Sequence, residues 1–182
     1  VWLIALCDAA VTIAAHYPSE ASNTILKFLV AGPPLMAANA TLTKTFLAGW
    51  VGIIAATAFR VASYRALGRL FTFELSIRED HKLISDGPYT FVRHPSYTAL
   101  YLLMPPMFAC QLGPGSWALE CGILKTPMGL VCASVWLGYM SLLCYVMAKR
   151  VNVEDEMLKE AFGHQWLEWA ARTRYRLIPG IY

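Results

Sequence analysis

The sequence predicts an all-α fold, a polytopic membrane helix bundle of about five transmembrane helices with a C-terminal interfacial helix. Of the 182 residues, 57% are hydrophobic and only 15% are charged, whereas an average soluble domain has about 25% charged residues. The mean hydropathy of +0.47 favours the same conclusion. Several apolar stretches also approach the roughly 20 residues that a helix needs to cross a bilayer.

Five apolar stretches are candidates for these helices. We expect the second to bend at Gly32-Pro33-Pro34 and the fourth to break at Pro105-Pro106, because proline removes a backbone donor and kinks a helix. The fifth contains no charged residue and is the clearest candidate. The five stretches are residues 1–17, 24–40, 46–64, 95–112 and 128–147.

The chain after the last apolar stretch is polar but keeps a helical pattern. Apolar residues between Glu154 and Arg172 recur at steps of three and four, and Gly163 is expected to interrupt the helix. Trp166 and Trp169 fall on one face of this helix. Such a face is typical of a helix that lies at a membrane interface.

Basic residues form two groups, one between the third and fourth apolar stretches and one after the fifth. The positive-inside rule places both groups at the cytoplasmic face. The fourth and fifth helices then form a hairpin that brings the two polar segments together, although some fifty residues separate them. The first group is Arg60, Arg65, Arg69, Arg78, Lys82 and Arg93, and the second is Lys149, Arg150, Lys159, Arg172, Arg174 and Arg176.

Net charge and cysteine content argue against other classes of protein. A net charge of +3 is too small to indicate nucleic-acid binding. The five cysteines form no CxxC pair and lie mostly in apolar stretches. We therefore expect them to be small buried hydrophobic residues, and we expect neither a disulfide framework nor a metal site.

The most informative stretch is the polar turn from Gly87 to Tyr97, directly before the fourth apolar stretch. It holds tyrosine, arginine, histidine and serine side chains within eleven residues. Polar groups at the mouth of an apolar helix cost free energy to bury unless they find partners, so this turn predicts a site.

A second polar group follows the fifth apolar stretch. Arg150 and Glu154 are four residues apart and share one helix face. Taken alone, they are as well explained by an exposed ion pair that contributes little to stability. Beside the polar turn, they supply a cation for a carboxylate and a carboxylate for an ammonium, which suits a zwitterionic ligand.

Both segments resemble the isoprenylcysteine carboxyl methyltransferase family. The first resemblance runs through Asp80-His81-Lys82-Leu83-Ile84 to Arg93-His94-Pro95-Ser96-Tyr97. The second begins with Arg150 and Glu154-Asp155 and closes with Arg176-Leu177-Ile178-Pro179. Together they cover about residues 71–182, and the order of the two motifs around one helical hairpin makes the resemblance specific.

The resemblance implies N-terminal transmembrane helices over residues 1–70. Residues 71–182 would form a methyltransferase core with a cofactor-binding turn, a transmembrane hairpin and a cytoplasmic C-terminal helix. The implied enzyme is a multi-pass protein of the endoplasmic reticulum membrane whose active site faces the cytoplasm. It would use S-adenosyl-L-methionine to methylate the C-terminal carboxylate of prenylated cysteine in CaaX-processed proteins. Its partners would be these proteins and membrane lipid, with no nucleic acid.

The family's functional residues carry over to matching positions of this chain. Arg150 matches the arginine that holds the substrate carboxylate, and Glu154 matches an acidic residue that contacts the cofactor. No metal is implied. The other cofactor contacts carried over are His81, Lys82, Leu83, Ile84, Tyr89, His94, Pro95, Ser96 and Tyr97.

Three other functions remain open at this point. One is a methyltransferase of the same superfamily that acts on another lipid. The second is a membrane enzyme like the sterol reductases, whose C-terminal ending resembles Tyr175–Tyr182, although Glu154-Asp155-Glu156 and Phe162-Gly163 favour the methyltransferase. The third is a membrane adaptor without activity.

Overall fold

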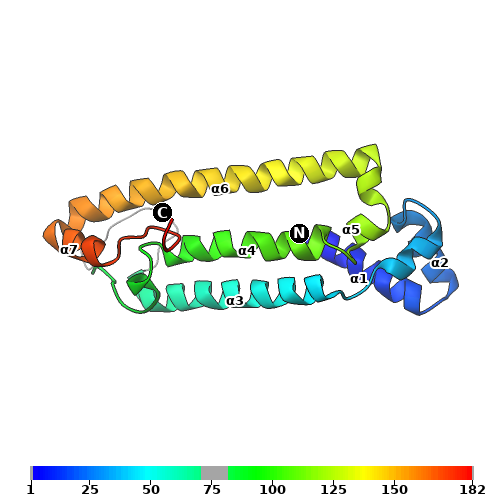
Figure 1. Ribbon diagram of the computed structural model, residues 1–182, viewed down its shortest axis with the longest axis horizontal. Coiled ribbons are helices and arrows are strands. Elements are labelled where there is room, and N and C mark those ends of the chain that lie inside the picture. The colour runs from blue at the N-terminus through cyan, green and yellow to red at the C-terminus, as the bar shows by residue number, and fades with distance from the viewer. Residues whose placement is uncertain (1, 71–81, 182) are drawn as a thin grey trace. The chain divides into compact units, whose positions relative to one another are not determined.

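The computed structural model describes residues 2–70 and 82–181, and all the regular secondary structure in these ranges is helical (Figure 1). The predicted all-α class is therefore confirmed.

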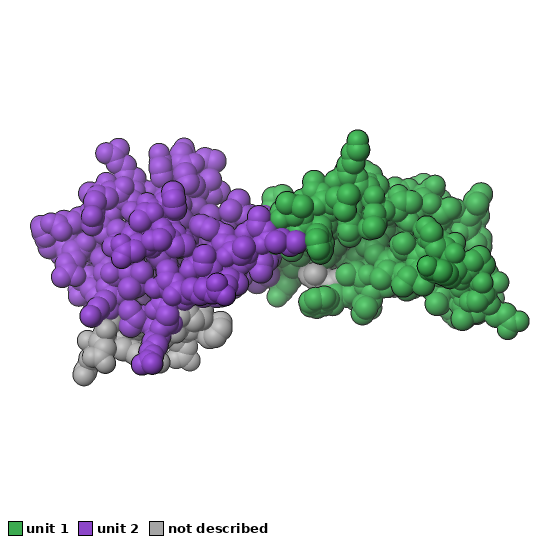
Figure 2. Space-filling model, turned by 90° about the horizontal axis from the view of Figure 1, so that it is seen from below, with its two compact units in different colours: residues 1–53, 104–140 green, residues 54–103, 141–182 purple. Residues whose placement is uncertain are grey.

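Contacts divide the chain into two compact units (Figure 2). Unit 1 comprises residues 1–53 and 104–140, and unit 2 comprises residues 54–103 and 141–182. The helices are α1 (Trp2–His16), α2 (Glu20–Leu29), η1 (Pro34–Asn39), α3 (Lys44–Leu67), η2 (Gly68–Leu70), η3 (Gly87–Thr90), α4 (Pro95–Leu112), α5 (Trp117–Glu120), η4 (Ile123–Lys125), α6 (Pro127–Phe162) and α7 (His164–Arg172).

Short helices in unit 1 enclose an apolar core. The core joins α1, α2, η1 and the residue after α5 through small and aliphatic side chains that exclude water. The side chain of Ser19 caps α2 by accepting from the backbone N–H of Ser22, and the backbone N–H of Trp117 donates to Asp8 of α1. The buried members of this core are Val11, Ala14, Leu26, Val30, Ala37, Ala40 and Cys121.

The predicted second span, residues 24–40, is wrong. The helix α2 ends at Leu29, and the chain continues into the separate 3₁₀ helix η1. The backbone N–H of Ala31 donates instead to the carbonyl of Cys121, at 2.9 Å. Because Pro33 and Pro34 lack backbone donors, an unbroken helix through this stretch would lose two ladder hydrogen bonds.

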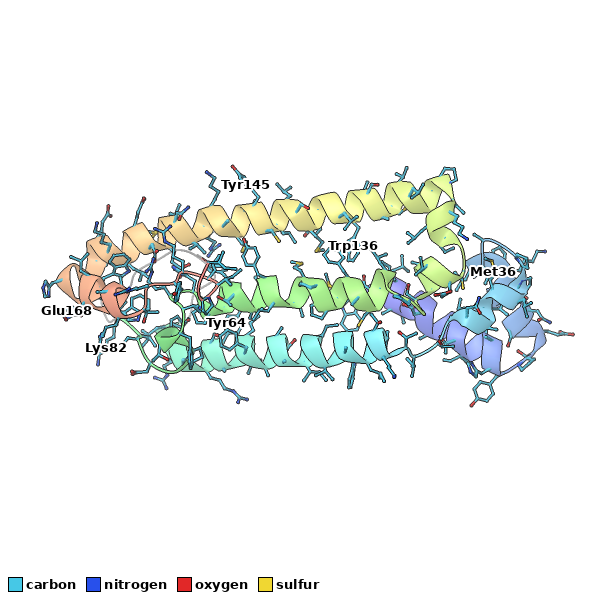
Figure 3. The ribbon with its side chains drawn as sticks, viewed as in Figure 1. Met36, Tyr64, Lys82, Trp136, Tyr145 and Glu168 are labelled. Atoms are coloured by element: carbon cyan, nitrogen blue, oxygen red, sulfur yellow. The ribbon has the colours of Figure 1, made fainter. Side chains whose placement is uncertain are left out.

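The predicted break at Pro105-Pro106 is also wrong, because α4 continues through both prolines. Glycines of α3 allow close packing at this point: a Cβ at Gly49 would lie 2.9 Å from the Pro106 carbonyl oxygen, and one at Gly52 would lie 2.8 Å from the Pro106 Cβ. Membrane helices tolerate proline where a neighbouring helix packs closely in this way. In the same unit, Trp136 of α6 packs edge-on against Phe108 of α4, with ring centroids 4.8 Å apart (Figure 3).

Two described helices are long and apolar enough to cross a membrane, Lys44–Leu70 and Pro127–Phe162. The predicted number of about five spans is therefore not confirmed. The apolar stretch 128–147 and the first part of the predicted interfacial helix belong to one 36-residue helix, α6. It ends where Gly163 adopts a φ of +51°, as the predicted interruption requires.

Candidate functional site

In unit 2, the polar turn and the C-terminal tail pair through their backbones. The backbone N–H of Arg93 donates to the carbonyl of Tyr175, and that of His94 donates to the carbonyl of Arg176, both at 2.9 Å. The helix α4 starts directly afterwards at Pro95, whose missing N–H is no loss in a first helical turn. The predicted meeting of the two polar segments is therefore confirmed.

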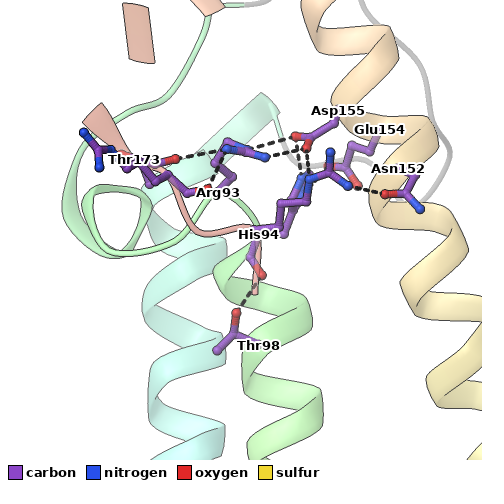
Figure 4. Close-up of polar contacts among 9 residues, drawn as sticks. Arg93, His94, Thr98, Asn152, Glu154, Asp155 and Thr173 are labelled. Atoms are coloured by element: carbon purple, nitrogen blue, oxygen red, sulfur yellow. Dashed lines mark hydrogen bonds and ion pairs between the residues drawn. The ribbon is translucent and has the colours of Figure 1, made fainter. Parts of the chain in front are cut away.

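A single buried carboxylate gathers side chains from both segments (Figure 4). Asp155 of α6 is 4% exposed and accepts two hydrogen bonds from the Arg93 guanidinium, at 3.3 Å from Nε and 2.9 Å from Nη2. His94 Nε2 lies 2.9 Å from Asp155 Oδ1, and Arg176 Nε lies 3.2 Å from Oδ2. The remaining nitrogen of Arg93, Nη1, donates to the carbonyls of Thr173 and Arg174. The cluster thus ties α6, the polar turn and the tail together.

These partners decide the ionisation of Asp155. Burial alone would raise the pKa of its carboxyl, but hydrogen bonds and electrostatic attraction from His94 and Arg93 outweigh burial and hold that pKa below its usual range. The surrounding hydrogen-bond donors therefore stabilise the ionised form of the Asp155 carboxyl.

His94 lies between two carboxylates. Its ring is 3% exposed, with Nε2 on Asp155 and Nδ1 3.9 Å from Glu154 Oε1. A distance of 3.9 Å is too long for a hydrogen bond. The Glu154 side chain is 31% exposed, so unlike Asp155 it is open to a ligand.

Two tyrosine side chains, Tyr89 and Tyr97, lie near the Glu154 carboxylate. The hydroxyl of Tyr97 lies close to the side chains of both Glu154 and Arg150. Tyr89 is buried, and burial together with the nearby charge of Glu154 raises the pKa of its hydroxyl. Tyr64 of α3 also lies close enough to Tyr89 to affect this pKa, and its own hydroxyl accepts a hydrogen bond from Arg60 at 2.7 Å.

The tail also holds the polar turn from its other side. The indole N–H of Trp169 donates to the Tyr89 carbonyl at 3.3 Å, and the Thr173 hydroxyl donates to the same carbonyl at 3.4 Å. Trp169 is 3% exposed, and the Arg93 guanidinium lies 5.6 Å from the ring centroid of Trp166. Trp169 is therefore buried against the polar turn and is not exposed at a membrane interface. The expected interfacial placement of the two tryptophans is wrong for this residue.

Comparison with known proteins shows which sequences this chain is similar to. A family model described as the isoprenylcysteine carboxyl methyltransferase family matches residues 47–112. Protein-S-isoprenylcysteine O-methyltransferase B of Arabidopsis thaliana is 28% identical over 128 residues, which cover 69% of this chain and 55% of the relative. The Dictyostelium discoideum protein-S-isoprenylcysteine O-methyltransferase is 24% identical over 152 residues, covering 76% of this chain and 52% of the relative.

The predicted resemblance to the isoprenylcysteine carboxyl methyltransferase family is confirmed by the family model and by these relatives. The chain spans about half the length of the curated relatives it matches. No solved structure matches it. The match to the family model includes the polar turn and α4 but not α6. Because the relatives are named as methyltransferases, the reductase alternative is not favoured.

Among the residues that the family resemblance selected, the structure brings five together. Glu154 is one of them, and Tyr89, His94, Tyr97 and Arg150 lie near its carboxylate. Their roles toward a ligand stay predictions.

The other selected residues lie outside this group. Pro95 is buried in the first turn of α4, and Ser96 beside it is half-buried. Lys82 is exposed, whereas Leu83 and Ile84 are half-buried; within residues 2–70 and 82–181, no polar contact ties these three to Glu154. His81 lies outside the described residues.

Sequence reasoning missed the residues behind the site. Asp155, Arg93 and Arg176 were visible only as parts of motifs, and Tyr64 was not selected at all. One signal could have separated Asp155 from Glu154: Val151, four residues earlier on the same helix face as Asp155, is apolar, whereas Arg150 precedes Glu154. Val151 is fully buried in the structure.

The arrangement contains three kinds of side-chain group that can bind a ligand. The partly exposed Glu154 carboxylate can bind a cation, the half-buried Arg150 guanidinium can bind an anion, and tyrosine rings can contact a cationic or planar group. In the part of the chain that the structure describes, no group of three or more His, Cys, Asp or Glu residues is placed to hold a metal ion.

Proposed function

We propose that this protein transfers a methyl group from S-adenosyl-L-methionine to the C-terminal carboxylate of a prenylated cysteine. The observation that carries the proposal is that the Glu154 and Arg150 side chains both lie close to Tyr97, a residue in the first turn of α4. One negative and one positive side chain side by side fit a reaction between a cationic donor and an anionic acceptor. The names of the relatives supply the chemical identity of that acceptor.

The side chains present fit S-adenosyl-L-methionine. Its ammonium needs an accessible carboxylate, which Glu154 supplies, and its sulfonium and purine suit the rings of Tyr89 and Tyr97. The predicted contacts with Lys82, Leu83, Ile84, Pro95 and Ser96 belong to this proposal. When bound, the cofactor supplies an activated methyl group.

The acceptor needs orientation rather than a base. An α-carboxylate has a pKa of about 3.5 and is ionised at neutral pH. Arg150 would hold one side of this carboxylate, while half-burial of the guanidinium keeps competing water away. Fixing both reactants in reactive geometry would supply most of the rate enhancement.

The membrane would deliver the prenyl group. The apolar part of α6 is not buried within the protein, and its exposed side chains include Leu130, Val135 and Leu142. Such a helix suits contact with lipid chains. We propose a multi-pass protein in which α3, α4 and α6 cross the endoplasmic reticulum membrane. Both basic groups, and therefore the site, would face the cytoplasm.

The direct test is an assay of methyl transfer in membranes that contain the protein. The assay uses labelled S-adenosyl-L-methionine with N-acetyl-S-farnesylcysteine as acceptor. We expect the wild-type protein to form the methyl ester and both Arg150→Ala and Glu154→Ala to lose that activity. Lys149→Ala and Glu156→Ala are matched controls, because both side chains are exposed neighbours on the same helix.

Each alternative gives a different result. Cofactor binding with transfer only to another lipid would reject the prenylcysteine acceptor and retain the methyltransferase. Binding of a reduced nicotinamide in place of S-adenosyl-L-methionine would reject both. Equal loss of activity in the control variants would reject the assignment of Arg150 and Glu154.

A further inference from the structure

Asp155 lies behind the proposed site, and the proposed reaction gives it no role. Four side-chain contacts converge on its buried carboxylate, two from Arg93, one from Arg176 and one from His94. An ionised carboxylate only accepts hydrogen bonds. In the 2.9 Å contact between His94 Nε2 and Asp155 Oδ1, the histidine nitrogen is therefore the donor.

This contact determines what the other ring nitrogen can do. A neutral imidazole whose hydrogen is on Nε2 keeps a lone pair on Nδ1. His94 Nδ1 and Glu154 Oε1 are then two acceptors that lie 3.9 Å apart. A single N–H₃⁺ group can donate to both at ordinary hydrogen-bond lengths, since it carries three hydrogens.

The ring has a carboxylate on each side. Asp155, which faces Nε2, is also held by Arg93 and Arg176, so its position is fixed by several contacts. Glu154 faces Nδ1, and its side chain is 31% exposed. The geometry therefore leaves the Nδ1 side of the ring, together with Glu154, as the side that a ligand can approach.

We propose that Asp155 is a positioning residue that holds the His94 hydrogen on Nε2, so that Nδ1 joins Glu154 in binding the ammonium group of the methyl donor. The inference rests on the proposed function, because it takes the donor's ammonium as the ligand. It differs from a purely structural role, in which Asp155 only fastens the tail to the polar turn. A structural role would affect all ligands equally, whereas a positioning role would affect only those that carry the ammonium.

The test compares two ligands and two variants by calorimetry on the purified protein. The ligands are S-adenosylhomocysteine and a deaminated analogue that lacks only the ammonium. The test variant is Asp155→Asn, which keeps the shape of the side chain but removes its charge. The matched control is Thr98→Val, because the Thr98 hydroxyl is equally buried and donates to backbone carbonyls, that of Leu177 in the tail at 2.6 Å and that of His94 at 3.2 Å.

We expect Asp155→Asn to weaken S-adenosylhomocysteine binding roughly 10- to 100-fold, with little change for the deaminated analogue. Thr98→Val should lower the melting temperature but leave both affinities unchanged. Equal weakening of both ligands by Asp155→Asn, or no weakening of either, would overturn the inference. If the wild-type protein bound neither ligand, the proposed function would fail first.

A spectroscopic measurement covers the case in which Asp155→Asn does not fold. The chain contains four histidines, so ¹⁵N-histidine labelling gives few signals, and loss of a signal in His94→Gln assigns the ring. We expect wild-type His94 to show a protonated Nε2 and an unprotonated Nδ1. A protonated Nδ1, alone or together with Nε2, would contradict the inference without affecting the assay of methyl transfer.

Discussion

The two compact units differ in the kind of contact that fills their interiors. Unit 1 encloses small and aliphatic side chains such as Val11, Leu26 and Ala37, and its polar contacts mostly complete helix ends. Unit 2 buries Arg93, His94 and Asp155 in contact with one another. Apolar contacts are non-directional, whereas buried ionic hydrogen bonds require defined geometry and lose much free energy when one partner is missing.

This difference indicates which unit requires defined side-chain geometry. A buried ion cluster is weak evidence of stability, since apolar side chains of the same volume often stabilise a fold as well or better. The cluster in unit 2 is more readily explained by the orientation it imposes on His94, Glu154 and the tail. Unit 1 shows no comparable buried ion cluster among its described residues.

The largest expected effect comes from removing the central charge of unit 2. Asp155→Ala leaves two guanidinium groups and a histidine without their shared acceptor, and breaking such a buried pair costs about 3–5 kcal/mol. Hydrogen–deuterium exchange should show faster exchange in residues 82–103 and 141–181 than in the wild type. Protection in residues 2–53 should change much less; an equal loss in both units would break the comparison.

A smaller effect is expected from the apolar core of unit 1. Leu26→Ala removes a buried side chain from this core and should lower the free energy of unfolding by about 2–3 kcal/mol. Exchange should rise in unit 1, while binding of S-adenosylhomocysteine to unit 2 stays unchanged. Loss of ligand binding would show that the site depends on the apolar core.

The smallest expected effect is a difference in acid sensitivity. The folded-state pKa of Asp155 is below its unfolded value of about 3.9. The stabilisation it provides is therefore fully present above that value and is lost as the pH falls through the folded-state pKa. Exchange protection in unit 2 should decline below about pH 4 in the wild type and lose this dependence in Asp155→Asn. An unchanged acid profile in the variant would show that another group controls it.

The sequence alone predicted what depends on local signals. Pro95 marks the start of α4, Gly163 marks the end of α6, and the distribution of arginine and lysine predicted that the two polar segments meet. Proline at a first helical turn and glycine at a positive φ act within one turn of the chain. Charge asymmetry acts through the bilayer and is also visible without a structure.

What the sequence did not predict depends on tertiary packing. Pro105 and Pro106 lie within α4 because Gly49 and Gly52 admit a close approach, which no local rule indicates. Whether Glu154 or Asp155 is buried depends on which face of α6 meets His94. The distinction between the two neighbouring carboxylates therefore required the fold, although the resemblance had selected the right turn of helix.

The most direct test of the account is to locate the methyl-donor site by photoaffinity labelling. A photoreactive S-adenosyl-L-methionine analogue, with unlabelled donor as competitor, would be mapped to peptides of the protein. We predict competed labelling of peptides from unit 2, around residues 82–97 and 150–154. Competed labelling confined to residues 2–53 or 104–140 would contradict the account, because it would place the site among the apolar contacts of unit 1.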